Sequence, residues 1–161
     1  MLRRSFDLIV CGCLLLFIGC GPAVDLSQGL QVDVEQTGWF DAGIVNGQNK
    51  LVPMAAFRLK NVSGQRLSML QVNALFRRVT EPDEWGSALV TAAGSAGLPP
   101  GATTDTLTVK SQLGYTGVDP RQEMLKNTHF VDAKVELFAK YGSTQWVRVG
   151  EYPIVRELIT K

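Results

Sequence analysis

The chain has 161 residues, of which 45% are hydrophobic and 8% are aromatic. This composition supports one domain with a buried core and differs from that of disordered chains. Of the 16 basic and 15 acidic side chains, Arg3, Arg4 and Asp7 precede the first apolar block, which leaves 14 of each sign in the rest of the chain. A neutral remainder argues against a nucleic-acid-binding protein, because binding to phosphates requires a basic surface.

The amino terminus has the order of residues of an export signal. Two arginines precede the eleven-residue apolar run 8–18, and the small residues 19–21 follow it. A helix that spans a bilayer needs about 20 apolar residues, and Pro22 opposes continuation of a helix. A cleaved signal peptide over residues 1–19 is therefore expected.

The stretch Phe17-Ile18-Gly19-Cys20 resembles the lipobox of bacterial lipoproteins. The resemblance implies that Cys20 becomes the lipidated first residue and anchors the protein to a membrane of the cell envelope. In that family an Asp directly after the cysteine often retains the protein on the inner membrane. Here Gly21 takes that position, so the expected location in a host with two membranes is the outer membrane, facing the periplasm. Ordinary secretion and a retained apolar helix are the alternatives.

The three cysteines, Cys11, Cys13 and Cys20, all lie in the first twenty residues. The remaining 141 residues can form no disulfide, so the exported domain must be stable through burial of its core. A domain of about this size removes roughly two-thirds of its unfolded surface from water. Cys11 and Cys13 could be read as a metal or redox pair, but they lack partner ligands and lie inside the apolar run. No metal site and no cofactor are expected.

The segment 20–29 is short and polar. It is interpreted as the lipidated cysteine followed by a tether that could reach about 30 Å when extended. Residues 30–161 are predicted to form a single domain, because no long linker, repeat or low-complexity segment interrupts them. The length of this predicted tether would limit how far the domain can stand from the membrane.

Within this domain the hydrophobic residues alternate with a period of two, which is typical of half-buried strands. In the segment 68–78, Leu70, Val72, Ala74 and Phe76 share one face. Segment 130–141 repeats the pattern. The other predicted strands are 30–36, 51–62, 87–93, 103–111 and 146–155.

Turn signals separate these segments. They are Asn46-Gly47, Asn61-Val62-Ser63-Gly64, Leu98-Pro99-Pro100-Gly101 and Gly142-Ser143. Asn61-Val62-Ser63 also fits an N-glycosylation acceptor, but a turn is the favoured interpretation. One helix is predicted over Asp119–Asn127, with Asp119 as its N-cap and Pro120 in its first turn.

About seven strands at this spacing, with one short helix before the penultimate strand, predict an all-β, immunoglobulin-like antiparallel β-sandwich. The run Phe57–Gly64, the strand Val72–Phe76 and the loop Leu98–Gly101 also resemble the small immunoglobulin-like envelope domains called FxLYD-like. The resemblance covers residues 52–112 and implies an envelope domain of the same fold. The functions of that family are mostly unassigned.

Residues suited to catalysis are few. His129 is the one histidine, and a lone histidine at the entry of a strand is usually not a ligand or a base. No serine lies in a nucleophile elbow, and the glycines of 94–101 lack the residues of a phosphate-binding loop. Glu81-Pro82-Asp83-Glu84 is the densest acidic cluster, and a solvated turn is favoured over a calcium loop. The protein is therefore expected not to be an enzyme.

If the strands alternate in direction, the loops 39–50, 80–86 and 112–129 gather at one end and the short turns at the other. The first group carries the candidate binding residues Trp39, Phe40, Trp85 and Tyr115, since aromatic side chains on loops are enriched at binding hot spots. The alternative is that these aromatic side chains fold inward and close the end of the sandwich. The tether leaves from the short-turn end.

The function expected from these observations is a non-enzymatic binding or assembly module with a protein partner in the envelope. A structural subunit of an envelope complex is one alternative. A metal-dependent enzyme that uses the acidic loops is a weaker one, because the domain lacks cysteine and a recognisable base.

Overall fold

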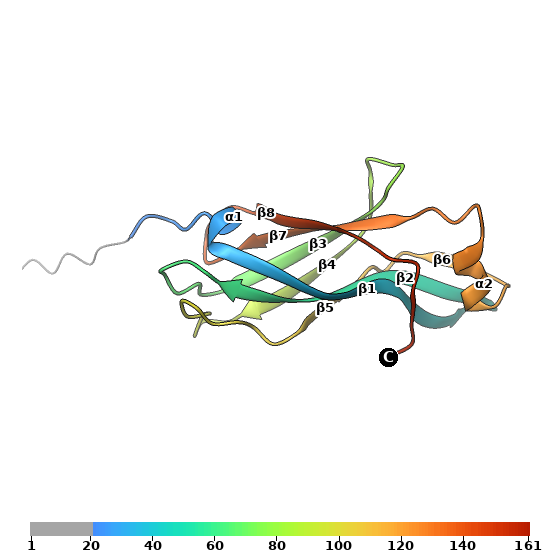
Figure 1. Cartoon of the computed structure of the whole chain (residues 1–161), viewed down its shortest axis with the longest axis horizontal. Helices are drawn as coiled ribbons and strands as arrows, with labels where there is room; N and C mark the ends of the chain where they lie inside the picture. Colours follow the sequence, from blue (N-terminus) through green and yellow to red (C-terminus); the bar gives the residue numbers. More distant parts are fainter. Residues whose placement is uncertain (1–20) are drawn as a thin grey trace, which may run out of the picture.

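The computed structural model describes residues 21–161, so the predicted signal peptide and Cys20 lie outside the described residues. The described chain folds into two β-sheets that face each other across one core (Figure 1). The first sheet has the order β5-β2-β1-β9, with β6 also paired to β2, and the second has the order β4-β3-β7-β8. Every pairing is antiparallel except that of β1 with β9. The predicted all-β sandwich is confirmed.

The strands of the first sheet are β1 (Leu30–Val45), β2 (Gln48–Asn61), β5 (Leu107–Lys110), β6 (Tyr115–Gly117) and β9 (Leu158–Ile159). Those of the second sheet are β3 (Leu70–Arg78), β4 (Glu84–Ala93), β7 (Ala133–Lys140) and β8 (Val147–Pro153). The seven predicted strands are all present. The short strands β6 and β9 were not predicted, because three and two residues are too few to show a period.

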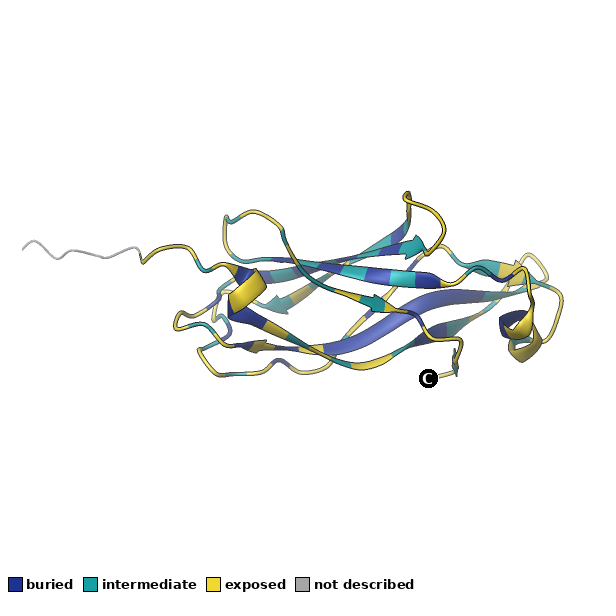
Figure 2. Cartoon of the chain, turned by 45° about the horizontal axis from the view of Figure 1, so that its top comes forward, coloured by how far each residue is buried: buried dark blue, intermediate teal, exposed yellow. Residues whose placement is uncertain are grey.

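The core lies between the sheets and is lined by alternate residues of the strands. Figure 2 shows that the loops at both ends are mostly exposed and that the buried residues lie mainly along the strands. In β3 the predicted inward residues Leu70, Val72, Ala74 and Phe76 are all fully buried, while their neighbours are partly exposed. Strand β7 alternates in the same way. Strands β3 and β7, which have the clearest predicted alternation, are neighbours at the centre of the second sheet.

The hairpin of β1 and β2 is longer than predicted. Asn46 and Gly47 form its two-residue turn with φ of 51° and 77°, the left-handed values that a type I′ turn requires. The predicted turn is thus correct, but the predicted loop 39–50 is wrong, because Trp39 and Phe40 lie inside β1. The pairing register shifts between Val34 and Gln36. The extra residue of β1 at this shift moves every later residue to the opposite face of the strand. The alternation that begins at Leu30 therefore ends at the shift, although the strand continues.

The segment before β1 is also part of the folded body. Leu26–Gly29 form the short helix α1, and the Asp25 carboxylate accepts a hydrogen bond from the Ser27 N–H at 2.9 Å. The Leu26 side chain is only 1% exposed. The prediction of a free tether over residues 20–29 is therefore wrong from Val24 onward. A single buried leucine in a polar stretch gives no periodic signal, so only packing shows its role.

Helix α2 (Arg121–Lys126) precedes β7, as predicted, but it is shorter than Asp119–Asn127. Its N-cap is Pro120, and no side chain caps it. The predicted capping role of Asp119 is wrong. Its backbone carbonyl instead accepts a hydrogen bond from Asn49 Nδ2 at 2.9 Å, which ties the start of the helix to β2.

Asn61 organises the turns at one end of the sandwich. Its side chain is fully buried, and Nδ2 donates to the carbonyl oxygens of Gln65 and Leu98 at 2.7 and 2.9 Å. Its Oδ1 accepts hydrogen bonds from the N–H and the hydroxyl of Ser63. The turn interpretation is confirmed, and the folded domain offers no free amide for glycosylation at Asn61.

The two ends of the sandwich differ. One end, here called the proximal end, carries α1 and the connections 62–69, 94–106 and 141–146. Gly21 lies beside Gln65 of the first of these connections. The turn of the β1–β2 hairpin and the loop that carries α2 lie at the opposite, distal end (Figure 1). Within residues 21–161, no helix has the length and apolar character needed to cross a membrane.

Candidate functional site

Four aromatic side chains pack together toward the distal end. Trp39 of β1 meets Phe130 edge to face with ring centroids 4.6 Å apart and also lies 5.5 Å from Tyr115. Tyr115 lies 4.4 Å from Phe130 and 5.1 Å from Trp85. These distances are in the range where aromatic pairs add to the stabilisation from burial alone. The four residues are called the aromatic cluster below.

The structure brings three of the four predicted aromatic residues together and separates the fourth. Trp39 is fully buried, and Trp85 and Tyr115 are half-buried against the same core. The inward alternative therefore describes Trp39, which presents no surface to a partner. Phe40 follows Trp39 in the strand and points to the other face of the first sheet, where Lys110 Nζ lies 3.3 Å from its ring centroid.

Phe130 is the member of the cluster that the sequence did not single out. It precedes β7, and the structure buries it at 7% exposure. Its position beside His129 at the predicted entry of a strand was visible in the sequence. Phe130 joins the cluster because the loop after α2, which carries it, folds back over the end of the sandwich.

Polar contacts hold this loop in place. The Tyr115 hydroxyl hydrogen-bonds to both the N–H and the carbonyl of Val131, each at 3.1 Å. The Arg156 guanidinium donates to the Asp132 carboxylate at 2.7 Å, to the Phe130 carbonyl at 2.8 Å and to the Leu125 carbonyl at 3.2 Å. One arginine therefore binds several points of the segment 125–132, and its bond to Asp132 raises the pKa of Arg156 despite partial burial.

A second ion pair holds α2 against the β1–β2 hairpin. Arg121 Nε lies 2.6 Å from the Asp41 carboxylate, which also accepts a hydrogen bond from the Gly43 N–H at 2.8 Å. Burial raises the pKa of Asp41, but the Gly43 N–H and the Arg121 guanidinium together outweigh it and keep that pKa below its ordinary value. Asp41 therefore stays charged and tied to the helix at neutral pH.

Beside the aromatic cluster is a pocket of about 200 Å³, here called the distal pocket. Its lining residues are Tyr115, Thr116, Gly117, Asp119, Met124, Asn127, His129 and Phe130. Met124 and Phe130 are buried, whereas Thr116, Asp119, Asn127 and His129 are exposed. The pocket thus joins an apolar floor to a polar rim, a combination typical of binding sites.

The acidic segment 81–84 lies between the end of β3 and the start of β4. Glu81 pairs with Arg78 across 2.8 Å at the β3–β4 turn, and Arg78 also lies 4.9 Å from the centre of the Trp85 ring. Among residues 21–161, no group of three or more His, Cys, Asp or Glu side chains is arranged to hold a metal ion. His129 lines the distal pocket rather than joining such a group.

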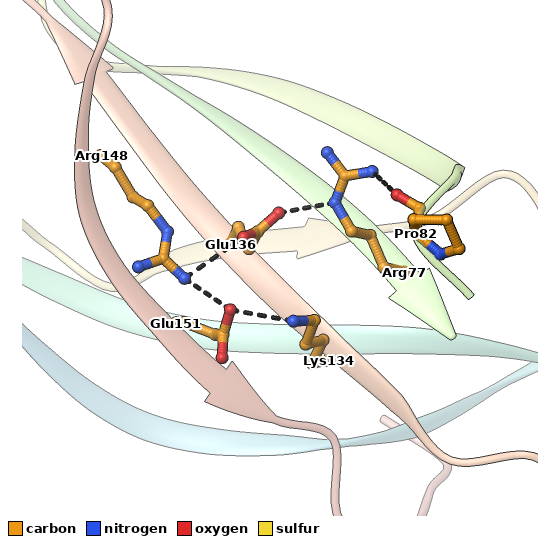
Figure 3. Close-up of polar contacts among 6 residues, drawn as sticks. All are labelled: Arg77, Pro82, Lys134, Glu136, Arg148 and Glu151. Carbon is orange, nitrogen blue, oxygen red and sulfur yellow. Dashed lines mark hydrogen bonds and ion pairs between the residues drawn. The ribbon is translucent and has the colours of Figure 1, made fainter. Parts of the chain in front are cut away.

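A network of ion pairs covers the outer face of the second sheet (Figure 3). Glu136 accepts from Arg77 at 2.6 Å and from Arg148 at 3.2 Å, and Glu151 accepts from both Arg148 and Lys134. The hydrogen bond from Arg77 lowers the pKa of Glu136; partial burial opposes this, and the charges of Arg77, Arg148 and Lys134 add to it. All five charged side chains find partners within the network, so this face presents paired charges.

The described chain is thus a β-sandwich protein with an aromatic cluster and a small pocket toward one end. No family model matches it, and no curated protein matches it. Among solved structures, it has some similarity to a crystal structure described as Northeast Structural Genomics Consortium target SoR45. That match has a TM-score of 0.41 and 13% sequence identity, and it covers 80% of this chain and 88% of that chain.

Proposed function

We propose that this chain is a lipid-anchored protein of the bacterial cell envelope that works as a non-enzymatic binding or assembly module. The order of the amino-terminal residues and the lipobox-like stretch that ends at Cys20 support the anchor. Gly21 at the next position favours the outer membrane, with the domain facing the periplasm, in a host with two membranes. Two or more acyl chains would hold the protein stably, since each buried methylene contributes about 0.8 kcal/mol.

One observation carries the proposal: the described chain begins at the end of the sandwich opposite to the distal pocket. Gly21 lies beside Gln65 at the proximal end. Helix α2, whose Met124 lines the pocket, lies at the distal end (Figure 1). Attachment through Cys20 would therefore leave the pocket facing away from the membrane. A partner in the envelope could reach it there.

The attachment would also be short. Gln65 Nε2 donates to the Pro22 carbonyl at 2.8 Å, and the Val24 N–H donates to the Tyr141 hydroxyl at 2.6 Å. Cys20 therefore lies two residues before a segment that is bound to the proximal turns. Two extended residues span about 7 Å. A lipidated Cys20 would keep the proximal end close to the membrane surface.

Metabolic labelling with a fatty acid tests the anchor. Cells that express the full chain should incorporate label into the wild-type protein and into the Cys13→Ala control, whose changed residue is removed with the signal peptide. The Cys20→Ala variant should lose the label and leave the membrane fraction. Label that persists on Cys20→Ala would contradict the assignment.

Photo-crosslinking in intact cells tests the binding role. A crosslinking amino acid at Thr116, on the rim of the distal pocket, is compared with one at Gly64 in a proximal turn. We expect a discrete crosslinked partner from position 116 and none from position 64. Equal crosslinking from both positions would argue against a binding role for the distal end.

A further inference from the structure

The distal pocket is small, with a volume of about 200 Å³. Binding sites for small molecules usually measure about 300–1,000 Å³. The pocket is therefore small for a cofactor or a metabolite and suits one group that projects from a larger partner.

The arrangement of its lining indicates the chemistry of that group. Met124 and Phe130 are buried, so whatever reaches deepest meets a thioether and an aromatic ring. The exposed residues of the rim can bind polar groups nearer the surface. Within the described chain, the side chains of Thr116, Asp119 and His129 form no hydrogen bond or ion pair, so their donors and acceptors are free for a partner.

The walls of the pocket are held before any partner arrives. Arg156 binds the carbonyl groups on either side of His129, from Asn127 and Phe130, and Tyr115 is fixed by Val131. A preformed pocket avoids part of the entropy loss that accompanies binding. An apolar side chain in such a pocket, surrounded by polar contacts, is the usual form of an interface hot spot.

We propose that the distal pocket receives one branched apolar side chain of leucine size from a protein partner, whose backbone N–H donates to the Asp119 carboxylate at the rim. This inference rests on the proposed function as a binding module and names the group that the module binds. Met124 and Phe130 contact the side chain, and Asp119 orients the backbone that carries it.

The test follows the Met124 methyl group by NMR in the full chain, purified in detergent with labelled methionine methyls. The first probe is N-acetylleucinamide, which carries the side chain and two amide groups. N-acetylalaninamide has the same amides with a shorter side chain, and 3-methylbutan-1-ol has the branched chain without the amides. The methyl groups of Met54 and Met69 lie outside the pocket and serve as internal controls.

We expect saturable shifts of Met124 with N-acetylleucinamide at a Kd on the order of millimolar, as befits a ligand of this size. Binding of N-acetylalaninamide should be at least about fivefold weaker, because little of its side chain reaches the floor. Asp119→Ala should weaken binding of N-acetylleucinamide more than that of 3-methylbutan-1-ol, because it removes the acceptor for the amide N–H and the alcohol carries no amide.

Gly117→Val blocks the pocket from within. A Cβ at Gly117 would lie 3.3 Å from Met124 Cε, and its backbone is outside the left-handed region. Gly94→Val is the matched control at the proximal end, where an added Cβ meets nothing within 4 Å. The first variant should abolish the Met124 shifts, and the second should preserve them.

Three results would overturn the proposal: equal affinity for the leucine and alanine probes, equal or tighter binding of 3-methylbutan-1-ol, or unchanged binding of N-acetylleucinamide in Asp119→Ala. The last of these keeps the test decisive even if Gly117→Val does not fold. Fatty acid labelling and probe binding are separate measurements. Protein that carries the fatty acid label but binds no probe would contradict the role proposed for the pocket and leave the lipid anchor standing. Protein that binds the probe but carries no fatty acid label would contradict the anchor and leave the role of the pocket standing.

Discussion

Arg156 and Phe130 are joined in two ways. The guanidinium lies 5.2 Å from the centre of the Phe130 ring, and its Nη2 donates to the Phe130 carbonyl at 2.8 Å. Arg156 follows β8, near the end of the chain, and Phe130 precedes β7. This pair therefore fastens the loop after α2 to the C-terminal segment, and with it one wall of the distal pocket.

Arg156→Met should release the loop. The variant keeps much of the side-chain length but loses every hydrogen bond to the segment 125–132, so we expect Tm to fall by roughly 5 °C. Hydrogen exchange should rise in that segment and stay unchanged in β3. Arg58→Met is the control, because Arg58 forms only exposed contacts, an ion pair with Glu35 and a hydrogen bond to the Thr106 hydroxyl. Similar losses in both variants would show that Arg156 has no special role.

Trp39→Ala should be the most destabilising change in the aromatic cluster. Removal of a fully buried tryptophan leaves a cavity and costs about 3–5 kcal/mol of unfolding free energy. Urea unfolding measures the loss. Trp39→Phe should cost less, because it keeps a ring and removes an indole N–H that has no hydrogen-bond partner within residues 21–161. Phe40→Ala, one residue along, should cost about 1 kcal/mol, since this ring lies on the outer face and is half-exposed.

Asn61→Ala should disorder the proximal turns. It leaves the Leu98 carbonyl without the Nδ2 donor in a buried setting and should cost about 1–3 kcal/mol. Asn73→Ala, on the outward face of β3, is the control and should change stability by less than about 0.5 kcal/mol. Chemical unfolding of the two variants compares them directly, and an equal effect would contradict the role assigned to Asn61.

The ion pairs of Glu136 should make stability depend on pH. Its pKa is lower in the folded protein than in the unfolded chain, so it stabilises the fold above its unfolded pKa and loses this effect as the pH falls through its folded pKa. Tm measured from pH 7 to pH 3 should show wild type above Glu136→Gln at neutral pH, with the gap closing below about pH 4.

The control for this measurement is Glu123→Gln, which removes an exposed ion pair with Lys126 on α2. Such surface pairs contribute little, so its Tm should stay near that of wild type throughout the range. A gap for Glu136→Gln that is the same at pH 7 and pH 3 would contradict a role for its charge.

Much of the fold could be predicted because its signals are local. Alternation over nine residues marks the inward face of β3, and the Asn-Gly turn of the first hairpin needs only two residues with left-handed backbone. The site was harder to predict. Trp39 and Trp85 could be recognised as aromatic residues of one end, but their burial depends on Phe130, which lies far along the chain.

The sequence by itself determined the strand pattern, the main turns, the place of α2 and the expectation of a lipid anchor at Cys20, because each depends on neighbouring residues. Only the tertiary structure decided which way Trp39 and Phe40 face. The register shift after Val34 reverses the faces of β1, and it is defined by pairing with β2 rather than by the residues of β1 alone. The distal pocket likewise exists only because the loop after α2 returns to β6, a contact that no local pattern contains.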